Sequence, residues 1–195
     1  MKLQLLIPTM TSRAAMREKL FAALMPQLAR WPQASYFCDD GTGSIGHKRQ
    51  RMVRAATADY VAFVDDDDMV APDYLDRIMP LLDHRPDTVG ITVYVTKDGK
   101  PYEPTPYFQH SLRHAEHWKW HANHRTPHHL CPTRRDLCLR SEFPDLMWNE
   151  DYTYAMRLLR HLETEQWSGN EPIYFYDYVL KEGDQFPNAD TAPSA

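Results

Sequence analysis

The sequence predicts an α/β protein with a mostly parallel central sheet flanked by helices. Short apolar runs that suit buried strands occur at residues 3–7, 36–38 and 60–64. After each run, the chain contains a segment that suits a helix. This order of strand, helix, strand, helix, strand, helix is typical of a parallel sheet covered by helices.

The three predicted helices differ in their signals. The first should follow Pro8, which ends the first strand because proline has no N–H to donate. Pro26 should bend or end it. The second helix is expected between 48 and 58, and the third near Pro72, whose fixed φ suits a first helical position. The apolar side chains of the first and third helices are Met16, Leu20, Leu24, Leu28, Leu75, Ile78, Met79 and Leu82.

The second half of the chain predicts a smaller mixed region. Apolar residues alternate over 89–95, as in a half-buried strand, and Asp98-Gly99 indicates a hairpin. Asn149 should cap a helix reaching about Leu162, and a last strand is expected over 173–179.

These elements predict one domain over 1–180, made of halves 1–96 and 97–180. A flexible tail should follow over 181–195, because this segment is polar and poor in apolar residues.

Composition narrows the class of protein. The chain has 195 residues, of which 43% are hydrophobic, so it can bury a core. Its formal charge of -5 argues against a generally basic nucleic-acid-binding surface, although it allows a local basic patch. The cysteines Cys38, Cys131 and Cys138 should be reduced, buried thiols of a cytoplasmic protein. No apolar run approaches the roughly 20 residues of a membrane helix, so we expect no membrane insertion.

Aspartates follow two of the predicted strands, as Asp39-Asp40 and as the run Asp65–Asp68. Ligands of open α/β sheets bind beyond the carboxyl ends of strands, so both clusters should meet at one crevice. Four adjacent carboxylates repel one another, and a divalent cation such as Mg²⁺ or Mn²⁺ is a natural counter-charge. The alternative, a solvated run on a surface loop, fits poorly with a position between an apolar strand and a helix.

The segment from Tyr60 to Leu75 resembles the signature of family-2-type glycosyltransferases with the GT-A (Rossmann-like) fold. That signature is an apolar strand, Asp-x-Asp-Asp, a proline and a helix. Asp65 and Asp67 match the pair, and Asp68 matches the aspartate that follows. The resemblance implies that the pair binds a metal and the ribose or diphosphate of a nucleotide-sugar, with a UDP-sugar as the expected donor.

Further landmarks of that family occur in order over about residues 3–178. The chain departs from the family at Lys48-Arg49-Gln50, where Ala-Arg-Asn is usual, and between Thr9 and Arg13. It is also shorter than most relatives and lacks their C-terminal extensions, which leaves the acceptor site open. The donor-binding residues implied by the resemblance are Pro8, Thr9, Arg13, Asp40, Arg49, Asp65 and Asp66.

The late sequence Asn149-Glu150-Asp151, followed by Arg157, resembles the family's Glu-Asp motif. Asp151 would take the proton of an acceptor hydroxyl, and the helix N-terminus would favour its ionised form. Glu150 would orient acceptor hydroxyls or support the base, and direct displacement would invert the anomeric carbon. Alone, these two residues would read as ordinary first-turn acids.

Seven histidines lie between 107 and 140, and the first six are spaced 4, 3, 4, 3, 4, which would place them on one helix face. This stripe could be a packed face, a second metal site or an acceptor surface, the last with Trp118, Trp120 and Arg134. The resemblance makes His129 the candidate metal ligand beside Asp67, with His128 as its alternative. The seven are His110, His114, His117, His121, His124, His128 and His129.

Two acceptors fit the sequence, a saccharide and hydroxymethylated bases in DNA, which would require a flipped base and salt-sensitive binding. Two other classes of protein are alternatives to a glycosyltransferase. Gly41, Gly43 and Gly46 match the dinucleotide pattern G-x-G-x-x-G of NAD-dependent oxidoreductases, but they follow the second strand and two aspartates that would repel a pyrophosphate. A non-catalytic metal-binding or interaction module would leave the aspartate run unexplained.

Overall fold

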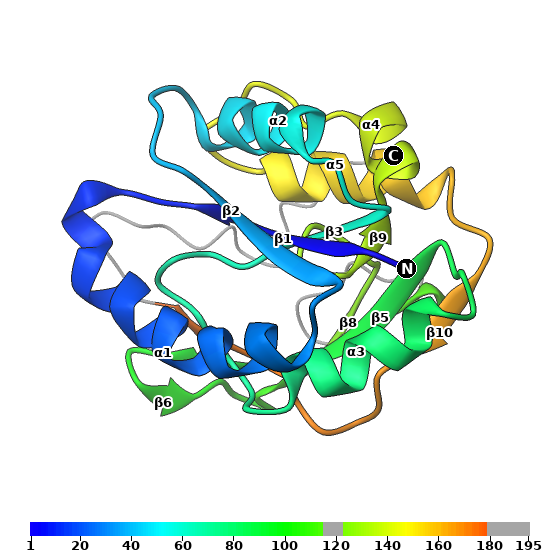
Figure 1. Cartoon of the computed structure of the whole chain (residues 1–195). Coiled ribbons are helices and arrows are strands. Elements are labelled where there is room, and N and C mark those ends of the chain that lie inside the picture. The colour runs from blue at the N-terminus through cyan, green and yellow to red at the C-terminus, as the bar shows by residue number, and fades with distance from the viewer. Residues whose placement is uncertain (115–122, 179–195) are drawn as a thin grey trace, which may run out of the picture.

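A computed structural model describes residues 1–114 and 123–178 (Figure 1). Its main sheet has the strand order β2-β1-β3-β9-β5-β11-β4. β1 pairs in parallel with β2 and β3, and β5 pairs in parallel with β10 and β11, which confirms the predicted α/β class. The strands of this path are β1 (Leu3–Pro8), β2 (Ala34–Asp39), β3 (Tyr60–Phe63), β4 (Met69–Val70), β5 (Thr88–Lys97), β9 (Thr133–Arg134) and β11 (Tyr174–Tyr178).

Helices cover both faces of this sheet. Figure 1 places α1 (Ala14–Arg30) and α3 (Tyr74–Leu82) on one side, and α2 (Ile45–Ala55), α4 (Arg135–Ser141) and α5 (Glu150–Leu159) on the other. Alternate residues of β3 enter different cores, so Ala62 packs with the α1/α3 layer and Phe63 with the α2/α4/α5 layer. This burial on both faces explains why β3 reads as a continuous apolar run.

Helix α1 continues through Pro26 to Arg30, so the expectation that this proline ends the helix is wrong. A buried glutamine secures the helix near this point. The Gln27 amide donates to the Ala71 carbonyl (2.9 Å) and accepts from the Leu75 N–H (2.9 Å). These bonds tie α1 to the start of α3, so tertiary contacts offset the backbone bond that proline removes.

β5 differs from the predicted half-buried strand, because its first six residues are all buried. Val89 and Ile91 face the core, while the Thr88 hydroxyl lies 2.9 Å from that of Thr133 on the neighbouring strand. The predicted hairpin is confirmed. Asp98 and Gly99, both with positive φ, join β5 to β6 (Lys100–Pro101).

The histidines of the stripe do not share one helix face in the part that the structure describes. His110 ends β7 (Tyr107–His110) and His124 begins β8 (His124–Arg125), and these two strands pair in parallel. A short 3-10 helix, η2 (Leu112–His114), follows β7, while β10 (Glu165–Trp167) pairs with β5. His117, His121, Trp118, Trp120 and the tail 181–195 lie outside the described residues.

Asn149 precedes α5 as predicted, but its side chain makes no capping bond. Its backbone is left-handed, with φ 61°, so this residue turns the chain into the helix by its conformation. The helix ends at Leu159, slightly before the expected boundary.

Candidate active site

The predicted aspartate clusters follow the carboxyl ends of β2 and β3, two strands that flank β1 in parallel. The chain's N-terminus lies at the start of β1, so the two clusters lie at the other end of these parallel strands (Figure 1). The turn after β1 joins them, since the Thr9 N–H donates to the Asp39 carbonyl (2.8 Å) and Lys48 donates to the Thr9 carbonyl (2.9 Å). Pro8 is the last residue of β1 and pairs with Asp39.

A buried arginine lies at the centre of the site. The Arg49 guanidinium donates to both oxygens of Asp65, at 2.8 and 3.0 Å, and to a carboxylate oxygen of Glu150. It also lies 5.7 Å from the centre of the Phe63 ring. One cation therefore joins the aspartate run after β3 to the first residue of α5. The sequence predicted Arg49 as a donor contact, whereas the structure gives it two protein carboxylates.

A second arginine binds the same run from the other side. Arg13, in the 3-10 turn η1 (Thr11–Arg13), pairs with Asp66 (3.1 Å) and Asp67 (3.0 Å). Asp66 is fully buried and also accepts the Met10 N–H (2.9 Å). Asp66 was predicted as a donor contact, but burial and these bonds make it an anchor for the turn after β1. Arg13 and Arg49 thus supply part of the counter-charge that the sequence argument assigned to a metal.

Asp68 is buried against Tyr174 of β11. The Tyr174 hydroxyl donates to the Asp68 carboxylate (2.6 Å) and accepts the Asp65 N–H (3.1 Å). Burial raises the pKa of Asp68 well above its usual value. Sequence reasoning missed Tyr174, because nothing in the sequence links a late strand to the aspartate run.

His129 approaches the aspartate run at Asp65. Its Nε2 lies 3.9 Å from the Asp65 carboxylate, while its Nδ1 is buried without a hydrogen-bond partner among the described residues. Burial lowers the pKa of His129 well below its usual value, which keeps the imidazole in the neutral form that binds metals. Asp67, the other predicted ligand, pairs with Arg13 instead.

The side chains around Asp65 and His129 suit a divalent cation for which the protein supplies only some of the ligands. No group of three histidine, cysteine or carboxylate ligands occurs within residues 1–114 and 123–178. Mg²⁺ is commonly held by one or two carboxylates together with substrate phosphates and water. Asp65 and Asp67 each share their carboxylate with an arginine, so together with His129 they supply only part of a coordination shell, which a bound nucleotide diphosphate would complete.

The two acids at the start of α5 have different surroundings. Glu150 is buried against Arg49, and burial raises its pKa. Asp151 is half-buried, and one of its oxygens accepts the Tyr152 N–H (2.7 Å). The structure thus ties Glu150 to the protein and leaves Asp151 partly exposed, which agrees with a supporting acid and a base.

The aspartate pair at the end of β2 contains one paired and one exposed residue. Asp39 forms two 2.8 Å bonds with Arg51, which lower the pKa of its carboxyl. Asp40, the predicted donor contact, is exposed beside it.

The glycine pattern has a packing role instead of the dinucleotide role. A Cβ added to Gly46 would lie 1.9 Å from the Pro144 carbonyl, so only glycine fits against this loop. The preceding Ser44 caps α2 by accepting the His47 N–H (3.0 Å).

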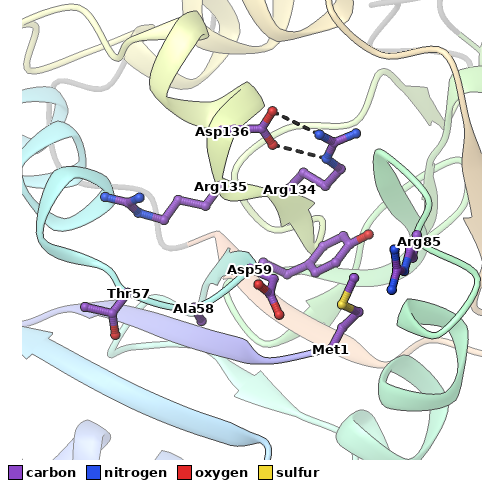
Figure 2. A pocket seen from close by; sticks show the side chains of 9 residues that line it. Met1, Thr57, Ala58, Asp59, Arg85, Arg134, Arg135 and Asp136 are labelled. Atoms are coloured by element: carbon purple, nitrogen blue, oxygen red, sulfur yellow. Dashed lines mark hydrogen bonds and ion pairs between the residues drawn. The ribbon is translucent and has the colours of Figure 1, made fainter.

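Arg134 lies far from the predicted crevice. In the antiparallel pairing of β9 with β3, Arg134 lies opposite Tyr60, the first residue of β3. The aspartate run follows the other end of that strand. Figure 2 shows Arg134 bonded to Asp136 in a pocket of about 550 Å³ that also contains Met1 and Arg85. Arg134 also bonds to Asp87, so its guanidinium serves the fold and its prediction as an acceptor residue is corrected.

A family model described as Glycosyl transferase family 2 matches residues 36–139, more than half of the 195-residue chain. The chain therefore belongs to glycosyl transferase family 2, as the motif resemblance predicted. A search of curated proteins finds no match.

Solved structures of S. aureus TarS are similar in fold. TarS 1–349 has a TM-score of 0.65 and 16% identity, over 91% of this chain and 60% of that one. TarS 1–349 in complex with UDP-GlcNAc has a TM-score of 0.63 and 14% identity, over 98% of this chain and 61% of that one. The chain thus spans about 60% of the TarS 1–349 chains, and the likeness agrees with the predicted GT-A fold. None of the described helices is long and apolar enough to span a membrane.

Proposed function

We propose that this chain transfers a sugar from a UDP-sugar to an acceptor hydroxyl, with Asp151 as the base. The observation that carries the proposal is the Arg49 bridge between Asp65 and Glu150. It fixes the donor-side aspartate run and the helix that carries the base as one unit. Enzymes gain much of their rate from such fixed relative positions of reacting groups. The family membership and the UDP-GlcNAc complex of TarS support the choice of donor.

In the proposed reaction, the acceptor oxygen attacks the anomeric carbon while the bond from that carbon to the diphosphate breaks. The acceptor proton passes to the Asp151 carboxylate, and UDP leaves with the electron pair of the broken bond. A single displacement of this kind inverts the anomeric centre. Glu150, held by Arg49, positions the first turn of α5 so that Asp151 faces the acceptor.

We propose Asp65 and His129 as the protein ligands of Mn²⁺ or Mg²⁺, with Asp67 close by on the same loop. A divalent cation there would neutralise charge that develops on the leaving diphosphate. Asp40, Thr9 and the end of β1 would contact the nucleoside. The acceptor is a saccharide or a hydroxymethylated base in DNA.

The test is UDP release from a panel of UDP-sugars, with Mn²⁺ or with EDTA. Asp65→Ala should abolish release, and Asp151→Asn should lower acceptor-dependent transfer by about 10²–10⁴-fold, the range for a general base. Asp73→Asn is the matched control, because Asp73 is exposed and its side chain does not cap α3. If the wild type releases no UDP and binds neither UDP nor Mn²⁺ by calorimetry, the proposal fails and a non-catalytic binding module becomes the better account.

A further inference from the structure

Three consecutive apolar side chains are exposed immediately before the base helix. Leu146, Met147 and Trp148 are 43%, 64% and 71% exposed. Trp148 has the largest exposure among the large hydrophobic side chains in the described ranges 1–114 and 123–178. Leaving an indole in water forgoes a large gain in free energy from burial, so this position calls for an explanation.

The backbone at the start of this segment is fixed. The Gly46 N–H donates to the Leu146 carbonyl (3.1 Å), and the Leu146 N–H donates to the Pro144 carbonyl (2.8 Å). Asp145 bonds to Ser44, the residue that caps α2. The absence of a side chain at Gly46 lets the two segments approach this closely. These contacts hold the loop up to Leu146, and anchoring of this kind reduces the entropy lost when a ligand binds.

The loop also lies beside the proposed reacting groups. Trp148 precedes Asp151 by three residues, and three residues of chain span at most about 11 Å. A saccharide that stacks on the indole therefore has only this short separation to span to bring a hydroxyl group to the Asp151 carboxylate.

The charge around Trp148 selects among acceptors. Residues 141–156 contain no lysine or arginine. Of their four carboxylates, Glu142 pairs with Arg54 and Glu150 is buried against Arg49, which leaves Asp145 and Asp151 outside these two ion pairs. Binding of DNA depends on cationic side chains that neutralise phosphates, and residues 141–156 supply none, so this segment offers a polyanion little to bind. A neutral saccharide has no such requirement, and its C–H face suits the flat apolar surface of an indole.

We infer that residues 146–148 form an acceptor platform on which Trp148 stacks against a ring of an uncharged saccharide. This inference rests on the proposed function and decides between its two acceptors. The platform binds the acceptor while Asp151 removes the proton, so Trp148 acts on acceptor affinity more than on donor affinity.

The experiment measures UDP release with and without a neutral oligosaccharide, using maltotriose, cellotriose and chitotriose, and in parallel a duplex containing hydroxymethylcytosine. At least one oligosaccharide should stimulate wild-type release. In Trp148→Ala the acceptor KM should rise about tenfold, as expected for loss of an aromatic contact, while Trp148→Phe should recover most of it. Met25→Ala, an exposed methionine of α1, is the control that should leave the acceptor KM unaltered.

Several results would overturn the inference while leaving the proposed function standing. One is stimulation by the hydroxymethylated duplex and by none of the oligosaccharides. Another is an equal acceptor KM in Trp148→Ala and Met25→Ala. A third is a change in sedimentation coefficient on Trp148→Ala, which would make the platform a contact between copies of the chain. Absence of UDP release by the wild type would instead overturn the proposed function itself.

Discussion

The donor-side and acceptor-side halves of the chain are built differently. Up to Asp68, strands of four to six residues alternate with helices, and the parallel strands β1, β2 and β3 end at the aspartate clusters. Beyond Lys97, the described strands have two to five residues, and four non-glycine residues among those described have positive φ, namely Asp98, Asn123, Glu142 and Asn149. Under the proposed function, the regular sheet of the first half would bind the donor, whereas the irregular loops of the second half would select the acceptor.

The strongest test of this comparison breaks the link between the halves. Arg49→Ala leaves the carboxylates of Asp65 and Glu150 without their shared cation, and Glu150 is buried. We expect a loss of about 3–5 kcal/mol in the free energy of unfolding, as for removal of one partner of a buried ion pair.

Urea denaturation of the wild type and Arg49→Ala measures this loss. Arg54→Ala removes an arginine whose ion pair with Glu142 is exposed, so its effect should stay below about 1 kcal/mol. Equal midpoints for the two variants would contradict a coupling role for Arg49.

A second test concerns the contact that β11 makes with the aspartate run. Tyr174→Phe removes the hydroxyl that donates to Asp68 and accepts the Asp65 N–H. Because both groups lose a buried partner, we expect a loss of about 1–3 kcal/mol. Tyr36→Phe is the matched exposed control, and thermal denaturation of both variants at neutral pH would compare them. A Tyr174→Phe protein as stable as Tyr36→Phe would show that the contact contributes nothing.

The third test uses pH to weaken the acceptor side selectively. His110, His128 and His129 are buried together: the rings of His110 and His128 meet edge to face at 4.1 Å between centroids, and those of His128 and His129 stack at 4.6 Å. Burial lowers the pKa of His128 from 6.5 to about 3 and lowers the other two well below 6.5. Between these values the unfolded chain binds more protons, so stability falls as pH falls below about 6.5.

The free energy of unfolding, measured by urea denaturation between pH 7 and pH 5, should therefore decline. The expected loss is of order 1 kcal/mol per pH unit for each such histidine. His110→Phe should reduce the slope, whereas His84→Gln, at an exposed site, should leave it as in the wild type. Identical slopes for all three proteins would mean that His110 does not titrate on unfolding.

The donor half was largely predictable because its signals are local. The apolar run 60–64 followed by aspartates indicated both a buried strand and the site at its end. The second half was less predictable because histidine spacing does not determine backbone conformation. His110 and His124 have helical spacing along the chain, yet they occupy two paired strands, since pairing with β5 and β8 stabilises the extended backbone of β7.

By itself, the sequence determined the fold class, the family and the acids of the candidate site, because strand patterns and clustered carboxylates are contiguous along the chain. Only the tertiary structure decided which partner each charged group has. Arg49 and Glu150 are 101 residues apart and Tyr174 and Asp68 are 106 apart, and no local pattern encodes such pairs. Likewise, Arg134 lies beside the start of β3, away from the aspartate run, because the antiparallel pairing of β9 with β3 fixes its position. Long-range pairing depends on how the layers pack, and that is a property of the whole folded chain.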